Sequence, residues 1–177
     1  MGMRLALTLF ATSLVPMFAQ DFKLPASLDR LAAKAEEFVD VTMDKSMLRF
    51  AGGFLGGQGD EARTRSFLAG LDSIQVKSFE FAREGEYTAA DLDSIRAQLQ
   101  APGWSKIVGV RSVRGENVDI YIKGAANGQA AGLVVLAAEP RELTVVSIVG
   151  TIDPARIGEL GGQFHIPQLR MGRRAER

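Results

Sequence analysis

The sequence predicts an α+β domain: an antiparallel sheet, made of a C-terminal four-stranded meander and two N-terminal strands, with helices packed on one face. Helical periodicities lie before Trp104, apart from one short closing helix, whereas most of the later residues form short β-patterned runs separated by tight turns. Strands joined by short turns are antiparallel, and helices gathered beside such a sheet make an α+β domain. With 177 residues, 46% of them hydrophobic, the chain can bury the core of one domain, which we place at residues 20–170.

The N-terminal half combines four helical patterns with two strand patterns. Residues 38–43 are short and rich in β-branched side chains, and residues 74–81 alternate, so both runs predict strands. A capping box formed by Thr88 and Asp91 opens the last of the four helices. The other three helices are predicted to begin at the capping residues Ser27, Asp44 and Asp60.

Four strands are predicted in the meander, at residues 105–113, 117–123, 133–138 and 143–149. The last two runs are apolar on both faces, so we place them at the centre of the sheet, joined by a tight turn at Pro140. The second run alternates as a half-exposed strand does, with Asp119, Tyr121 and Lys123 opposite its aliphatic residues. Pro154 begins the short closing helix.

The first nineteen residues have the anatomy of a secretory signal peptide. Arg4 supplies a positive start, residues 5–15 are almost wholly apolar, and Ala19 offers a small residue for cleavage. A membrane-spanning helix needs about 20 apolar residues, and this apolar run is shorter. We therefore expect residues 1–19 to be removed, the alternative being a buried N-terminal helix. Residues 171–177 are expected to form a disordered tail.

The absence of cysteine bears on both location and chemistry. A domain of this size can be exported without disulfides, and the chain lacks the acylated cysteine of bacterial lipoproteins. Thiol catalysis and zinc–thiolate sites are excluded. The 21 basic residues balance the 21 acidic ones, which argues against nucleic acid and anionic membranes as partners. We expect an exported, soluble protein, periplasmic or extracellular, with no membrane anchor after signal cleavage.

His165 is the one histidine of the chain and a weak candidate for a catalytic base. A histidine base needs a nucleophile and an orienting carboxylate, and no Gly-x-Ser-x-Gly elbow occurs. Phe164 and Ile166 alternate with it, so we expect them to pack inward and His165 to face water, with a pKa near the ~6.5 of free imidazole. Residues 57–62 match Gly-x-Gly-x-x-Ala, but a dinucleotide site follows a strand, and here a helix precedes. We interpret them as a loop.

Carboxylates are the remaining catalytic candidates. Three pairs stand close in sequence, Glu36/Glu37, Glu84/Glu86 and Asp91/Asp93, and none has the spacing of a calcium loop. Four aromatic side chains fit a core better than a ligand pocket: Phe79, Phe81, Tyr87 and Trp104. The sequence thus predicts no catalytic residue, no cofactor and no metal ligand. A hydrolase that uses two carboxylates from distant strands stays open as the alternative.

Five segments carry a family likeness. They are LPASLDRLAAKAEE at 24–37, RAQLQAPGWSKIV at 96–108, NVDIYIK at 117–123, AAEPRELTVVSIVGTID at 137–153 and ELGGQFHIP at 159–167. Together they resemble the bacterial family called domain of unknown function 4252, over residues 21–167. The resemblance implies exported proteins without an established activity, some of them lipoproteins, and members found beside genes for sigma and anti-sigma factors. It supplies no catalytic residues, and the missing lipoprotein cysteine puts anchoring of this chain in doubt.

These observations favour a non-enzymatic domain that binds an envelope protein, such as an anti-sigma factor, or a small envelope ligand. The predicted interaction face is the outer face of the meander, formed by Arg111, Asp119, Tyr121 and Lys123. A purely structural or folding-assisting role in the envelope is not separated from binding by the sequence.

Overall fold

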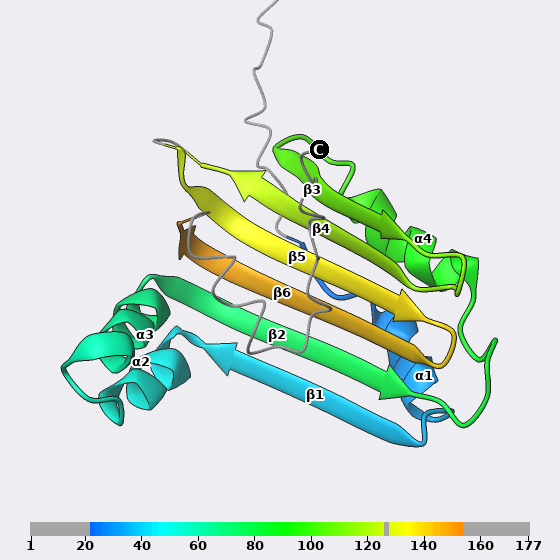
Figure 1. Ribbon diagram of the computed structural model, residues 1–177, viewed down its shortest axis with the longest axis horizontal. Coiled ribbons are helices and arrows are strands. Elements are labelled where there is room, and N and C mark those ends of the chain that lie inside the picture. Colours follow the sequence, from blue (N-terminus) through cyan, green and yellow to red (C-terminus); the bar gives the residue numbers. More distant parts are fainter. Residues whose placement is uncertain (1–21, 126–127, 154–177) are drawn as a thin grey trace, which may run out of the picture.

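The computed structural model describes residues 22–125 and 128–153, which form a six-stranded antiparallel sheet with helices beside it (Figure 1). The predicted α+β class is confirmed. The elements are η1 (Ala26–Leu28), α1 (Asp29–Ala32), β1 (Glu37–Asp44), α2 (Lys45–Gly53), α3 (Gly59–Ala69), β2 (Leu71–Glu80), α4 (Ala89–Gln98), β3 (Trp104–Arg111), β4 (Asn117–Gly124), β5 (Ala130–Glu139) and β6 (Glu142–Ile152).

The strands follow the order β1-β2-β6-β5-β4-β3, and every neighbouring pair is antiparallel. β3 to β6 form the predicted meander, and the N-terminal pair extends it because β2 pairs with β6. β5 and β6 are central and largely buried, as predicted from their apolar residues on both faces. In this order β1 and β3 are the two edges of the sheet. The chain crosses from β2 to β3 through α4.

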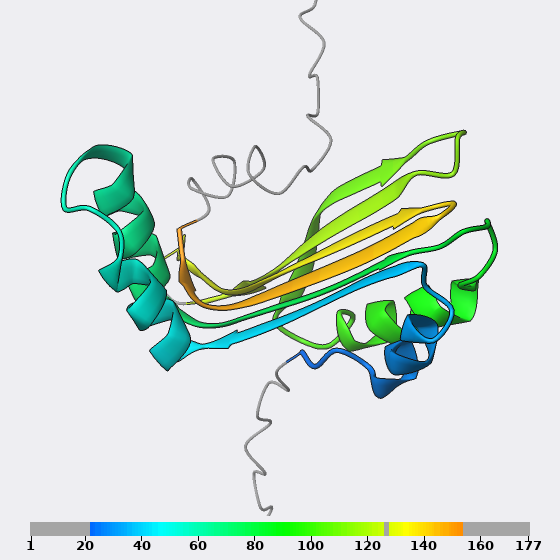
Figure 2. The same ribbon diagram turned by 90° about the horizontal axis from the view of Figure 1, so that it is seen from below.

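Figure 2 shows α1 and α4 on one side of the sheet and the α2–α3 pair at one end of it. We call the side covered by α1 and α4 the α1/α4 face. Its core includes Phe79 of β2, Phe81 just after β2 and Ile95 of α4, each fully buried. Tyr87 and Trp104 pack against this core, so the four aromatic residues belong to the core as predicted.

The opposite face, which we call the α2/α3 face, holds a second core. Leu48 of α2 and Phe67 of α3 pack there with Leu133 of β5 and Ile148 of β6. The prediction that the helices pack on one face holds for α1 and α4, whereas α2 and α3 pack against the second core on the opposite face. α2 follows β1 directly, and the buried apolar side chain of Leu48 lies at one end of this second face.

Two of the predicted helix starts are confirmed and two differ. The Asp44 carboxylate accepts the Met47 N–H at 2.9 Å, and Thr88 and Asp91 form the capping box. Ser27 caps no helix, and its buried hydroxyl lacks a hydrogen-bond partner within the described residues. Asp60 lies inside the first turn of α3, because the bond from the Ala62 N–H to the Gln58 carbonyl already starts the helix at Gly59.

Four predictions fall on residues outside the described ranges. They are the signal peptide at 1–19, the helix from Pro154, the orientation of His165, and the tail at 171–177. These remain predictions.

Candidate functional site

Asp119 of β4 is the centre of the region in which the sequence predicts an interaction face. It projects from the α1/α4 face, in register with Gly109 of β3 and Leu136 of β5. Its side chain is only 1% exposed. Tyr121, two residues along the same strand, is buried as well. The expectation that these two side chains lie on an outer, half-exposed face is therefore wrong, because α4 and the core residues around it cover this part of the sheet.

Three cationic side chains converge on the Asp119 carboxylate. Arg111 Nη2 of β3 lies 2.9 Å from Oδ1, and Lys106 Nζ of the same strand donates to Oδ1 at 3.0 Å. From the other side, Arg96 of α4 donates to Oδ2 through Nε at 3.2 Å and Nη2 at 3.1 Å. We call Arg96, Lys106, Arg111 and Asp119 the Asp119 cluster. It joins the edge strand, the adjacent strand and the covering helix.

The cluster keeps a positive charge. Burial alone raises the pKa of Asp119, but hydrogen bonds from Lys106 and Arg111 outweigh it, so the pKa lies below its usual value. The hydrogen bond to Asp119 also raises the pKa of Lys106. Asp93, 3.6 Å from Arg96, is the second carboxylate there, so three cations face two anions and one positive charge remains. The cluster is thus suited to hold an anionic group.

The four predicted residues are only partly brought together. Arg111 and Asp119 are in direct contact, and Tyr121 joins them through Lys106, whose Nζ lies 5.2 Å from the centre of the tyrosine ring. Lys123 lies further along β4, opposite Trp104. Sequence reasoning missed Arg96 and Lys106. Arg96 could have been found, because it follows Leu92 by four residues and so borders the predicted buried stripe of α4.

Asp91 is the second deeply buried carboxylate of the described residues, and it has a structural role. One oxygen accepts the Thr88 N–H and hydroxyl, each at 2.8 Å, and the other accepts Arg30 of α1. These bonds outweigh the effect of burial, which raises the pKa, so the pKa of Asp91 is lowered. A carboxylate held ionised in this way fixes α1 to the start of α4 and is poorly suited to act as a general acid.

Glu139, at the end of β5, is the carboxylate whose pKa shifts in the opposite direction. Burial, followed by repulsion from Glu142 and Glu116, raises its pKa. The carbonyl of the same residue accepts the Tyr87 hydroxyl. A carboxylate whose pKa is raised in this way is suited to act as a general acid.

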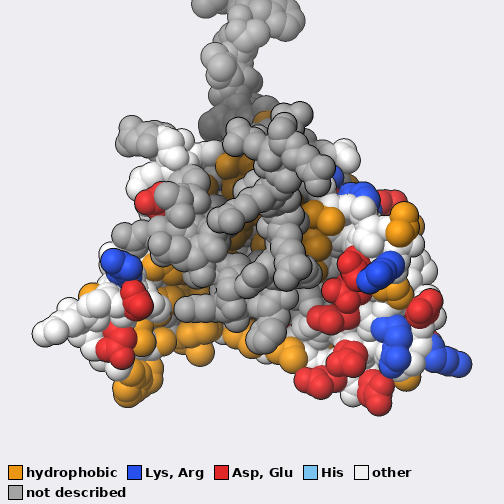
Figure 3. All heavy atoms as spheres, viewed as in Figure 1, with side chains coloured by type: hydrophobic (Ala, Val, Ile, Leu, Met, Phe, Trp, Pro, Cys, Tyr) orange, Lys and Arg blue, Asp and Glu red, His pale blue; other side chains and the backbone are white. Residues whose placement is uncertain are grey.

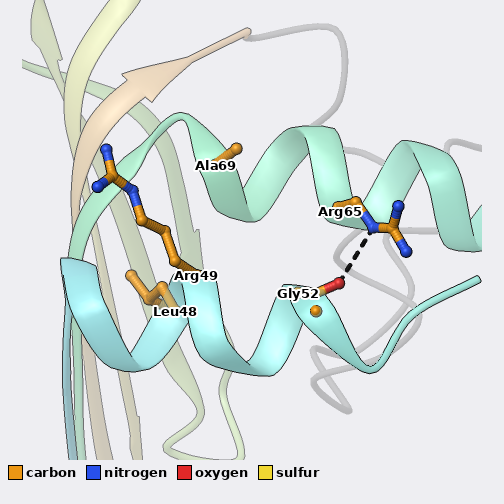
Figure 4. Close-up of a pocket in the computed structure, with 6 residues that line it drawn as sticks. Leu48, Arg49, Gly52, Arg65 and Ala69 are labelled. Atoms are coloured by element: carbon orange, nitrogen blue, oxygen red, sulfur yellow. Dashed lines mark hydrogen bonds between the residues drawn. The ribbon is translucent and has the colours of Figure 1, made fainter.

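A cavity of about 310 Å³ lies between α2 and α3 (Figure 4). It is lined by Leu48, Arg49, Gly52, Gly53, Arg65 and Ala69. Arg65 Nε donates to the Gly52 carbonyl at 3.1 Å, which ties the two helices together. Its lining contains no carboxylate or histidine, so it offers no group for proton transfer. Of the residues 57–62 predicted as a loop, only Gly57 and Gln58 lie between these helices. The other four form the start of α3, so the loop prediction is wrong for them.

Within residues 22–125 and 128–153, no group of three or more His, Cys, Asp or Glu side chains is placed to hold a metal ion. None of the helices described in these ranges combines the length and the apolar composition that a membrane crossing requires.

Comparison with family models identifies the fold unit just described. Residues 32–160 match the model of the Domain of unknown function (DUF4252), which covers every strand, α2 to α4 and the whole Asp119 cluster. The chain belongs to this family. The resemblance seen in the sequence is thereby confirmed. No match was found among curated proteins or among solved structures. The functional evidence for this DUF4252 protein is therefore the arrangement of its own side chains.

Proposed function

We propose that this protein is an exported, non-enzymatic interaction domain of the bacterial cell envelope. The Asp119 cluster would bind an acidic segment of an envelope protein, such as the exported part of an anti-sigma factor. The observation that carries the proposal is the convergence of Arg96, Lys106 and Arg111 on one buried carboxylate. The signal-like residues 1–19 support export.

The cations of the cluster are both held in place and accessible. The side chains of Lys106 and Arg111 are 41% and 49% exposed, although both bond to Asp119. A cation that a buried carboxylate already orients loses little side-chain entropy when it meets a second anion. Their position on the edge strand β3 lets an extended acidic segment lie alongside them. Such a contact would be electrostatic, so it speeds association and weakens with salt.

Photo-crosslinking tests the proposal. A photoreactive residue at Ile107, exposed between Lys106 and Val108 on β3, should give a discrete product with one envelope protein when the full chain is expressed in its bacterial host. Lys106→Gln together with Arg111→Gln should reduce the yield about tenfold or more, since each pairing with an anion is lost while Arg96 still holds Asp119. Raising the salt concentration should act in the same direction.

Arg83→Gln is the matched control, because this exposed arginine bonds only to nearby Glu86 within the described residues. It should leave the yield unchanged. A product that survives the double substitution, or a chain that stays unprocessed in the cytoplasm, would contradict the proposal.

The rival function is a hydrolase, and the raised pKa of Glu139 is the observation that favours it. A hydrolase of this kind would cleave some member of a panel of chromogenic esters and glycosides. Loss of that activity in Glu139→Gln, with an unchanged urea melt, would replace the binding proposal.

A further inference from the structure

β1 is an unprotected edge of the sheet. Its eight residues pair with β2 without a register shift, and they contain no proline, lysine or arginine. Among the described residues no strand lies on its other side. Val39 and Val41, on the α2/α3 face, are each 38% exposed. Proteins usually guard such edges with a bulge, a proline or a lysine, because an open edge is a template for another strand.

Exposed apolar side chains continue from β1 into α2. Met47, Phe50 and the C-cap residue Phe54 are spaced by three and four residues, so they form one stripe along α2 and its end. All three are at least half exposed. Figure 3 shows hydrophobic side chains along the lower border of the molecule, over β1 and α2. A strand and a helix of the same segment thus present one apolar surface.

We propose that two copies of this chain pair through β1, antiparallel about a two-fold axis at Val41, and so form a continuous sheet across the dimer. The strand is self-complementary in this register. Val41 meets Val41 of the partner subunit, Val39 meets the partner's Met43, and Asp40 meets the partner's Thr42. Apolar residues therefore face apolar ones on the α2/α3 face. On the other face Asp40 lies opposite a hydroxyl and Phe38 lies opposite the partner's Asp44.

Charge complementarity selects this register. Glu37 and Lys45 are equally distant from Val41 in sequence, so each Glu37 comes to the end of the strand pair where the partner's α2 begins with Lys45. The amine of Lys45 also pairs with Asp72 of its own chain at 2.6 Å. An axis at Asp40 would oppose two Asp40 carboxylates, and an axis at Thr42 would oppose Asp40 to the partner's Asp44. Like charges directly opposite each other destabilise a strand pair.

The other edge makes a head-to-tail arrangement a poor competitor. β3 carries cations that would attract the acidic β1, but a register shift between Lys106 and Val108 interrupts its ladder. A chain of copies joined β1 to β3 would also grow without limit, whereas the β1 pair closes at two.

Cysteine crosslinking tests the pairing, because the chain has no cysteine of its own. Val41→Cys should oxidise to a covalent dimer, since paired residues on the axis lie within disulfide reach. Ile107→Cys on the opposite edge is the control. Ile107 is 47% exposed against 38% for Val41, yet its cysteine variant should crosslink at least about tenfold more slowly. A mixture of Val39→Cys and Met43→Cys chains should crosslink between the two kinds of chain, which reports the register.

Sedimentation of the full chain supplies the second measurement. The mass should rise with concentration from one chain to two and stop there, and Val41→Lys should weaken the dimer at least about tenfold while its urea melt stays normal. A chain that stays monomeric throughout, growth beyond two copies, or equal crosslinking of Val41→Cys and Ile107→Cys would overturn the proposal.

Discussion

The two edges of the sheet are built on opposite plans. β1 runs straight along β2 with acidic and apolar residues, whereas β3 is interrupted at Ile107 and carries Lys106 and Arg111. A bulge and basic side chains, lysine above all, are among the usual means of preventing an edge from recruiting another strand. The same sheet therefore protects one edge and leaves the other able to pair, which locates the two proposed contacts on different sides of the molecule.

The ion pairs behind the two edges are also reversed in sign. Behind β1, the mostly buried Lys77 amine bonds Asp29 of α1 at 2.8 Å and Asp40 of β1 at 3.0 Å. Behind β3, one carboxylate, Asp119, holds three cations. Each group ties an edge of the sheet to a helix on the α1/α4 face, or to the strand next to it. The residues that surround the central ion set the charge of each edge. The carboxylates around Lys77 make the β1 edge negative, and the cations around Asp119 make the β3 edge positive.

The largest effect is expected at the β3 edge. Asp119→Asn keeps the size of the side chain but leaves three cations without their shared anion, so it should cost about 2 kcal/mol of unfolding free energy. This is less than the loss of a fully buried pair, because the cations are partly exposed. Lys77→Met, its counterpart at the β1 edge, should cost about 1 kcal/mol, since Asp29 and Asp40 remain hydrated.

Urea melts of the two variants measure both values. Asp93→Asn, which removes an exposed carboxylate that pairs with Arg96, is the control and should stay within about 0.5 kcal/mol of the wild type. Equal losses in Asp119→Asn and Asp93→Asn would mean that the cluster does not brace β3.

The pH dependence should separate the two edges. The folded-state pKa of Asp119 is lowered, so its contribution is complete above the unfolded value of about 3.9 and is lost as the pH falls through the folded pKa. The folded-state pKa of Lys77 is raised: burial lowers it, but the bonds to Asp29 and Asp40 outweigh burial. Its contribution is therefore complete below about 10.4 and is lost as the pH rises further.

The measurable consequence is a pair of differences in unfolding free energy. The advantage of the wild type over Asp119→Asn should be constant near neutrality and shrink below about pH 3.9, while its advantage over Lys77→Met should shrink above about pH 10.4. Differences that vary in the reverse sense would show that the bonds described here do not set these pKa values.

Local chemistry explains what could be predicted from the sequence. The Thr88–Asp91 capping box and the Asp44 cap involve residues three positions apart, so a short window contains all the atoms needed. The central position of β5 and β6 followed from their apolar residues on both faces, because such strands must be covered twice.

Long-range pairing explains what could not. The alternation in β4 assigns Asp119 and Tyr121 to one face of the sheet. It does not reveal that α4 packs against that face and covers both side chains. The edge position of β1 follows from the pairing of β2 with β6, about 70 residues apart, which no local pattern in residues 38–43 reveals. Lys106 lies beside a bulge that the uninterrupted β pattern of residues 105–113 did not reveal.

The smallest effect is expected from deleting Ile107, and it tests whether the bulge is what protects β3. Ile107 is the extra residue between the Lys106–Tyr121 and Val108–Ile120 pairs, so its deletion restores an even ladder and leaves every flanking side chain on its present face. Since Ile107 is 47% exposed, the free energy of unfolding should change by no more than about 1 kcal/mol. The straightened edge should then recruit other chains. In a Val41→Lys background, which removes pairing through β1, sedimentation should show the deletion variant associating at concentrations where Ile107→Thr, which keeps the bulge, is monomeric. A deletion variant that stays monomeric would assign the protection of β3 to the charge of Lys106 instead, and Lys106→Thr in the same background would then be the variant that associates.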